Sequence, residues 1–174
     1  MACRAGDRLS GDEPVFAVAK AGDWPKIWPI VQDVLATGDT YPYPPDISES
    51  VAKAIWMKYG SREATFIARI DEQVVATAYV KPNQPGLGDH VANAGWMVAP
   101  AHQGRGVGRS FAEYVIQQAR ERGYHGMQFN SVVATNTGAV SLWESLGFEI
   151  VGTVPDAFRH PTGLVAVHVM YRRL

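Results

Sequence analysis

The chain contains one stretch in which closely spaced glycines run into a helix, Gln103-Gly104-Arg105-Gly106-Val107-Gly108. It follows an apolar segment that ends at Val98 and precedes apolar residues at helical spacing. The first turn of a helix has main-chain N–H groups without partners and a partial positive charge, so it suits an anion. Glycines there let the main chain approach phosphate oxygens without an intervening Cβ. The loop is therefore expected to hold a phosphate or pyrophosphate.

Two nucleotide-binding motifs fit this loop poorly. A dinucleotide fingerprint needs Gly-x-Gly-x-x-Gly, but position 109 is arginine, so the last glycine comes one residue early. A P-loop needs Gly-Lys-Ser/Thr after four spacer residues, and the stretch contains no lysine. A glycine-rich turn that serves only the fold remains an alternative.

In the first half of the chain, strands are expected at 15–20, 64–70 and 74–80, the last two joined by a hairpin at 71–73. A helix is expected over 23–36 with Asp23 as its cap. A second helix is expected after a capping box of Asp46 and Glu49, with apolar residues recurring at Val51, Ile55 and Tyr59.

The second half alternates strands and helices. Strands are expected at 90–98 and 127–134, and helices at 105–122 and 137–146. An antiparallel pair, 148–154 and 164–171, follows, joined by a turn over 155–161. This order predicts an α/β fold (an α+β mixed sheet) with helices on both faces. It forms one domain over 14–174 after a disordered tail, 1–13.

Composition excludes several function classes. Lysine and arginine total 16 against 17 acidic residues, which gives no basic surface for nucleic acid. No apolar run approaches the roughly 20 residues that cross a bilayer. Cys3 is the single cysteine, so no internal disulfide forms and a cytoplasmic location is expected. The five histidines lack metal-ligand spacing, so no metal is expected.

Two motifs together resemble the GNAT superfamily of N-acetyltransferases. The first is Gln103-x-x-Gly106-x-Gly108, preceded by Val98-Ala-Pro100 and followed by a helix. The second, residues 136–148, is similar to the family's Asn-x-x-Ala-x-x-Leu-Tyr-x-x-x-Gly-Phe segment. The resemblance implies acetyl-CoA as the acyl donor. It also implies the GNAT-like acyl-CoA N-acyltransferase fold, a mostly antiparallel central sheet whose fourth and fifth strands splay apart.

The resemblance also implies roles for individual residues. The pyrophosphate would bind main-chain N–H groups at 104–109, and the pantetheine arm would pair with the main chain at Met97 and Val98. The N–H near Val98 would stabilise the oxyanion, and Asn136 would act at both the cofactor and the active site. The cofactor-binding residues expected in this way are Met97, Val98, Gln103, Gly104, Arg105, Gly106, Val107, Gly108, Arg109, Asn136 and Trp143.

The chain departs from the family pattern at two places. Trp143 stands where many members have a tyrosine proposed to protonate the leaving thiolate, and an indole is no acid at physiological pH. Packing beneath the cofactor is the favoured interpretation of Trp143. The strand 90–98 lacks the glutamate that often serves as base, and offers Asn93 instead, while 127–134 offers Asn130. An amide binds by donating and accepting hydrogen bonds.

These asparagines and their flanking residues resemble those of the fungal L-azetidine-2-carboxylate N-acetyltransferases. That likeness implies that Asn93 and Asn130 bind the acceptor, Asn130 through its carboxylate, with Tyr41 and Trp96 lining a compact pocket. The expected function is acetylation of a small amino acid or cyclic secondary amine, in a possible homodimer. The alternatives are a peptide N-terminus or antibiotic amine as acceptor, or a catalytically silent acyl-CoA-binding module.

Overall fold

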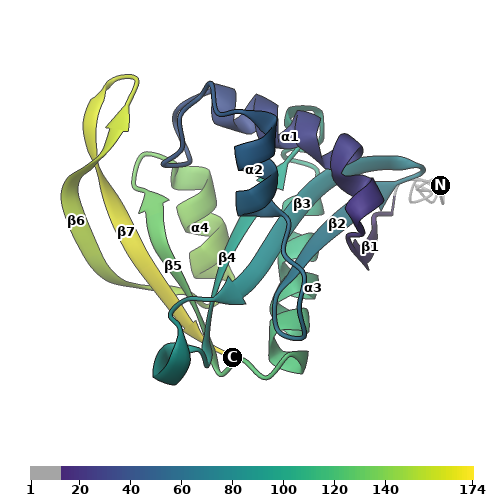
Figure 1. Cartoon of the computed structure of the whole chain (residues 1–174). Helices are drawn as coiled ribbons and strands as arrows, with labels where there is room; N and C mark the ends of the chain where they lie inside the picture. The colour runs from purple at the N-terminus through teal and green to yellow at the C-terminus, as the bar shows by residue number, and fades with distance from the viewer. Residues whose placement is uncertain (1–12) are drawn as a thin grey trace, which may run out of the picture.

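The structure is a computed structural model that describes residues 13–174; Cys3 and residues 1–12 of the expected tail lie outside the described residues (Figure 1). Its elements, in chain order, are β1 (Val15–Val18), η1 (Ala21–Asp23), α1 (Trp24–Ala36), α2 (Glu49–Trp56), β2 (Ala64–Ile70), β3 (Gln73–Pro82), η2 (Gly86–Gly88), β4 (Val91–Val98), η3 (Pro100–His102), α3 (Val107–Glu121), β5 (Gly126–Val133), α4 (Thr137–Ser145), β6 (Glu149–His160) and β7 (Gly163–Arg173).

The strands form one seven-stranded sheet in the order β1-β2-β3-β4-β5-β7-β6. All neighbours are antiparallel except β4 and β5, which are parallel and joined through α3. The β4–β5 pairing consists of Val91 with Gly126 and Ala92 with Met127. Beyond these pairs the two strands separate, and this region is called the β4–β5 gap below. The predicted splaying of the fourth and fifth strands is therefore confirmed.

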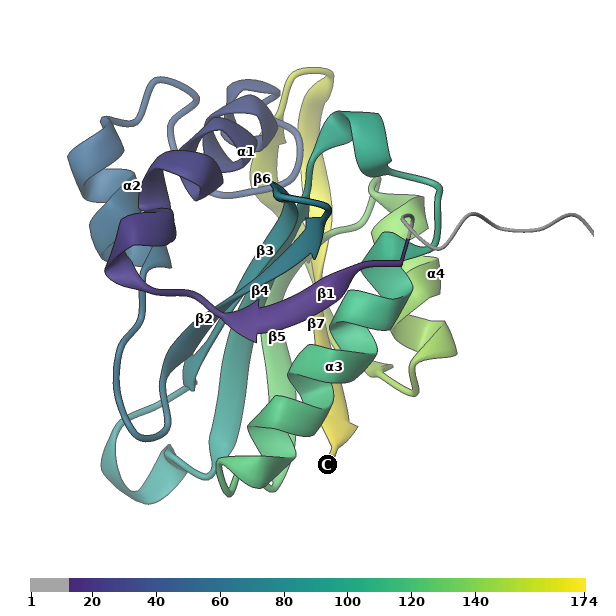
Figure 2. The same ribbon diagram turned by 90° about the vertical axis from the view of Figure 1, so that its right-hand side faces the viewer.

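The helices cover both faces of the sheet, as the sequence predicted. Figure 2 shows α1 and α2 on one side and α3 and α4 on the other. Phe111 and Val115 of α3 are buried in one hydrophobic cluster with the sheet, whereas Ile27 of α1 and Trp56 of α2 belong to a second cluster on the opposite face. Two separate cores on a continuous sheet hold β4 rigidly from both sides.

The start and the buried face of α2 differ from the prediction. The helix begins at Glu49 after Ser48, and the Glu49 carboxylate accepts a hydrogen bond from the Trp24 indole (2.8 Å), so the capping box with Asp46 is wrong. The core side of α2 carries Ala52 and Trp56, whereas Val51 is 50% exposed. Helical spacing identifies residues that share a face, but not which face the sheet covers.

Two further expectations are corrected. Asp23 occupies the N-cap position of α1, as expected, but its side chain makes no capping hydrogen bond. It accepts instead from the Lys20 N–H (2.8 Å) and pairs with Arg69 (2.6 Å). The segment 155–161 is not a turn, because β6 continues to His160 with an irregular register between Val154 and Phe158. A strand interrupted by a bulge carries a broken polar–apolar alternation, which resembles a loop in the sequence.

Candidate active site

The main chain of β4 presents alternate residues to the β4–β5 gap. The Val91 carbonyl accepts a hydrogen bond from the Asn83 N–H (2.8 Å), and the Ala99 N–H donates to the Val75 carbonyl (2.8 Å), so both residues face β3. Main-chain groups reverse direction from one residue to the next along a strand. Those of the even-numbered residues 92–98 therefore point toward β5 and the gap.

Tyr41, from the connection between α1 and α2, bonds this edge of β4. Its hydroxyl donates to the Trp96 carbonyl (2.7 Å) and accepts from the Trp96 N–H (2.9 Å). Burial raises the pKa of Tyr41 well above its ordinary value of 10.0, so the hydroxyl stays neutral. Sequence reasoning placed Tyr41 and Trp96 in the acceptor pocket wall. The structure commits the Tyr41 hydroxyl to the β4 main chain, and Trp96 lines only the narrow cavity next to the one that Asn93 and Asn130 line.

Met97 and Val98, the two residues expected to meet the pantetheine arm, face opposite ways. Met97 is buried and pairs with Thr77 in the β3–β4 ladder. Val98 faces the gap, where its carbonyl accepts a long hydrogen bond from the Gln103 side chain (3.3 Å). The Val98 N–H points the same way, so Val98 is the better placed of the two for a bound thioester.

The glycine loop carries an open row of N–H groups. Gly104 and Gly106 have φ of +72° and +85°, a region in which other L-residues are strained. The Gly106 carbonyl accepts from the N–H groups of Arg109 (3.1 Å) and Ser110 (3.2 Å). Among residues 13–174, no acceptor bonds the N–H groups of 104–106. A Cβ at Gly104 or Gly106 would meet nothing within 4 Å, so the loop opens onto free space.

The other residues of this loop play different parts. Val107 is buried beneath the loop, and Arg105 is exposed. The Arg109 guanidinium donates to the Ser145 hydroxyl (2.7 Å) on α4 and pairs with Glu113 (3.3 Å). Its side chain therefore joins α3 to α4, and the loop's anion-binding capacity lies in its main chain.

Asn136 is the N-cap of α4. Its Oδ1 accepts a hydrogen bond from the Ala139 N–H (3.2 Å), which satisfies a donor at the helix start. The Nδ2 group has no protein acceptor among the described residues. Asn136 lines two adjoining cavities of the β4–β5 gap, so this amide can donate to a ligand there.

Trp143 belongs to an aromatic cluster on the α4 side of the sheet. Its ring centroid lies 4.9 Å from that of Trp96 and 4.7 Å from that of Phe129, and Phe129 stacks on Phe148 at 4.4 Å. Trp143 is 8% exposed. The cluster forms an apolar floor for the gap and supplies no acid, as the packing interpretation of Trp143 predicted.

Three cavities follow one another along the gap. A cavity of about 790 Å³ lies at the glycine loop and is lined by Val98, Gly104, Gly108 and Asn136. A narrow one of about 120 Å³ shares Asn136 with the first and reaches Tyr41, Trp96 and Trp143. A third, about 690 Å³, shares Tyr41 and Phe129 with the second. The narrow cavity thus connects a site suited to an anionic carrier, at the glycine loop, with a second site in the third cavity.

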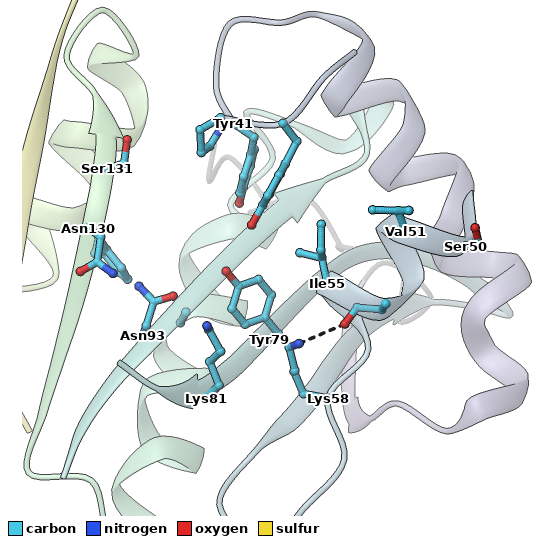
Figure 3. A pocket seen from close by; sticks show the side chains of 15 residues that line it. Tyr41, Ser50, Val51, Ile55, Lys58, Tyr79, Lys81, Asn93, Asn130 and Ser131 are labelled. Atoms are coloured by element: carbon cyan, nitrogen blue, oxygen red, sulfur yellow. Dashed lines mark hydrogen bonds between the residues drawn. The ribbon is translucent and has the colours of Figure 1, made fainter. Parts of the chain in front are cut away.

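The third cavity, called the acceptor cavity below, lies between α2 and the sheet (Figure 3). Asn93 and Asn130 line it, as expected, and the structure adds Tyr79, Lys58 and Lys81, which sequence reasoning missed. Lys81 is the cross-strand partner of Asn93. Because side chains alternate between the two faces of a strand, the predicted strand at 74–80 could have suggested that Lys81 shares a face with Tyr79. The pairing of Lys81 with β4 is not readable from the sequence.

Two structural findings concern other classes of site. Within residues 13–174, no helix is long and apolar enough to cross a membrane. In the same range, no three His, Cys, Asp or Glu side chains lie close enough together to hold a metal ion.

Comparison with known proteins agrees with this geometry. Residues 28–148 match the model of the Acetyltransferase (GNAT) family. A solved structure, a GCN5-related N-acetyltransferase from Kribbella flavida, is 45% identical to the chain. The likeness covers 92% of this chain and 98% of that one, with a TM-score of 0.88.

Two curated relatives match shorter segments. N-acetyltransferase aca1 of Schizosaccharomyces pombe is 41% identical over 62 residues, which are 36% of this chain and 30% of the relative. The L-methionine sulfoximine/L-methionine sulfone acetyltransferase of Salmonella typhimurium is 38% identical over 59 residues, 34% of each. The chain thus spans about a third of the length of these relatives. Because the family model covers more than half of the chain and the fold agrees with the Kribbella flavida structure over 92% of it, the chain belongs to the acetyltransferase (GNAT) family.

Proposed function

We propose that the protein transfers the acetyl group of acetyl-CoA to the amine of a small amino acid or cyclic secondary amine. The observation that carries this proposal is the line of adjoining cavities along the β4–β5 gap. One end has the open N–H groups of the α3 start, and the other has a cavity of about 690 Å³ whose polar lining includes Asn93, Asn130 and Lys81. Two sites joined end to end fit a direct transfer in a ternary complex, because both reactants then meet in one cleft.

The donor end fits coenzyme A. The N–H groups of 104–108 would hold its pyrophosphate, since Gly104 and Gly106 put no side chain in the way. The Val98 N–H and the Asn136 Nδ2 would meet the part of the carrier that enters the gap. Bound acetyl-CoA supplies an activated thioester carbonyl.

The transfer needs little acid–base help from the chain. The acceptor nitrogen attacks the carbonyl carbon, the C–N bond forms and the C–S bond breaks. The Val98 N–H would stabilise the oxyanion, and one such donor contributes about 10²–10³ in rate. Because an ammonium nitrogen has no lone pair, the acceptor loses one proton to solvent before it attacks, and the nitrogen loses a second to solvent once the C–N bond has formed. The thiolate takes one from water, because Trp143 cannot donate and a thiol pKa of about 8.5 makes a tolerable leaving group.

Thiol release from acetyl-CoA tests this function. The measurement compares a panel of amino acids, cyclic amines, a peptide N-terminus and an aminoglycoside as acceptors, with calorimetry of coenzyme A binding in parallel. We expect coenzyme A to bind and small amino acids to give the fastest release. Binding without thiol release on any amine would favour a silent acyl-CoA-binding module, the function suggested by the missing acid at Trp143. Preference for the peptide or the antibiotic would overturn the proposed substrate class.

We further propose a homodimer and a cytoplasmic location. The edge strand β6 exposes Ile150, Val151 and Val154, and Leu164 of β7 is exposed nearby. Apolar side chains on an unpaired edge favour contact with a second chain. A single cysteine suits a reducing compartment. Light scattering that gave the monomer mass would overturn the dimer.

A further inference from the structure

The acceptor cavity carries positive charge without negative charge. Lys58 and Lys81 line it, and no described residue among its lining is aspartate or glutamate. Tyr43 and Tyr79 are also present, and burial raises the pKa of each, so they are neutral hydroxyls rather than anions. A cavity with two cations and only neutral partners is complementary to an anionic group.

The two lysines come from opposite walls. Lys81 lies on β3 directly opposite Asn93 of β4, so the two side chains share one face of the sheet. Lys58 follows the end of α2, and its ammonium donates to the Ala54 carbonyl (3.1 Å). Figure 3 shows both ammonium groups beside the Tyr79 ring, with Asn93 next to Lys81. A ligand group bound in the cavity beside Tyr79 would therefore be attracted by both lysine charges.

The charges of these lysines are not neutralised by the protein. Burial lowers the pKa of Lys58, the nearby charge of Lys81 lowers it further, and Glu63 opposes the shift. In the described part of the chain, neither lysine is within ion-pair distance of a carboxylate. A bound carboxylate would relieve the repulsion and would itself gain charge-assisted hydrogen bonds.

The asparagines are less free than the lysines. The Nδ2 of Asn130 donates to Asn83 (2.7 Å), and its Oδ1 accepts from Gln128 (2.9 Å), so its amide is bonded at both ends. Asn93 uses its Nδ2 on the Gln128 carbonyl (3.0 Å), which leaves its Oδ1 as an acceptor. An acceptor oxygen suits an amine N–H, not a carboxylate.

We propose that Lys81, assisted by Lys58, binds the carboxylate of the acceptor, while the Asn93 Oδ1 accepts a hydrogen bond from its amine. This assignment rests on the proposed acetyl transfer and narrows it, because it makes the acceptor a small amino or imino acid with a free carboxylate. It replaces Asn130, the residue that the sequence favoured for the carboxylate. Neutral or polycationic amines lack the group that the two lysines recognise.

The test compares each acceptor with its amide, which keeps the amine and removes the negative charge. L-azetidine-2-carboxylate, L-proline and L-methionine sulfone are assayed beside their carboxamides by thiol release. We expect the wild-type kcat/KM to be about 10- to 100-fold higher for the acids, the effect of losing one charge-assisted contact. Lys81→Gln should lose that preference through acceptor KM, with the acetyl-CoA KM unchanged, and Lys81→Arg should restore part of it.

Lys53→Gln is the matched control, because Lys53 is an exposed lysine of α2 outside the cavity lining. It should behave as wild type, and urea denaturation checks that each variant folds. Equal kcat/KM for acids and amides in the wild type would overturn the carboxylate assignment while leaving acetyl transfer intact. A Lys81→Gln variant with raised KM for both the acceptor and acetyl-CoA would overturn the assignment as well. Absence of thiol release with every amine would instead overturn the proposed function.

Discussion

Replacing Gly106 by alanine separates two proposed roles of this glycine, its left-handed backbone conformation and its open approach for an anion. Gly106 has φ of +85° at the start of α3, and a Cβ there would project into open space at the loop. Gly123, just beyond the other end of α3, has φ of +80° and equally open surroundings. The two substitutions therefore impose the same backbone strain, and only one of them stands at the proposed pyrophosphate site.

The expected magnitudes follow from these conformations. An L-residue in the left-handed region costs about 1–2 kcal/mol, partly offset by the lower entropy of the unfolded chain with alanine. Both variants should therefore lose about 1 kcal/mol of unfolding free energy. At Gly106 the added methyl also keeps an anion from one N–H group. Each such bond contributes about 1.5–3 kcal/mol, which corresponds to roughly 10- to 100-fold weaker binding.

Urea denaturation and calorimetric titration with coenzyme A measure the two effects independently. We expect Gly106→Ala and Gly123→Ala to match in stability, and only Gly106→Ala to raise the Kd for coenzyme A. If both variants kept the wild-type Kd, the α3 start would not hold the carrier. If both lost affinity equally, the effect would be general strain on α3 rather than a blocked loop.

Two further substitutions test the acceptor side. Tyr41→Phe should destabilise the fold by about 1–3 kcal/mol in urea denaturation, because two half-buried main-chain groups of Trp96 lose their partner. Burial raises the folded-state pKa of Tyr41 above its ordinary 10.0, so the stabilisation from its neutral hydroxyl is complete below pH 10.0 and is lost as the pH rises toward the folded-state value. The difference in unfolding free energy between variant and wild type should therefore shrink from pH 8 to pH 11. A constant difference would contradict this. Gly95→Ala puts a Cβ 2.7 Å from the Tyr79 ring, which must shift. We expect about 1–3 kcal/mol of destabilisation and a raised acceptor KM with an unchanged acetyl-CoA KM. An unchanged acceptor KM would place the acceptor elsewhere.

Features that depend on residues close together in the chain could be predicted from the sequence alone. The glycine loop and the helix that it starts involve contacts within about four residues, so spacing alone locates them. The N-cap role of Asn136 is equally local, but only the structure identified it. The strand–helix–strand order of the second half likewise predicted a mixed sheet with helices on both faces. Local periodicity and turn chemistry determine such elements before any packing occurs.

The residues that line the acceptor cavity are brought together by packing between distant segments. Lys81 meets Asn93 through the β3–β4 register, and Lys58 reaches the same cavity from the end of α2. Of the three apolar residues expected on one face of this helix, Tyr59 lies beyond the end of α2 at Trp56. Val51 and Ile55 do share a face, but that face lines the cavity and not the core. Sequence spacing does not say which neighbour an element meets, because register and packing are set by contacts between distant segments.

By itself, then, the sequence determined the family, most of the elements and the glycine loop at the start of α3, since these follow from short-range patterns. Only the tertiary structure decided which polar groups are free to act. It committed the Asn130 amide and the Tyr41 hydroxyl to protein partners and left two ammonium groups facing one cavity. Hydrogen bonds between distant segments consume or spare a side chain, and the distances that decide this exist only once the sheet has formed.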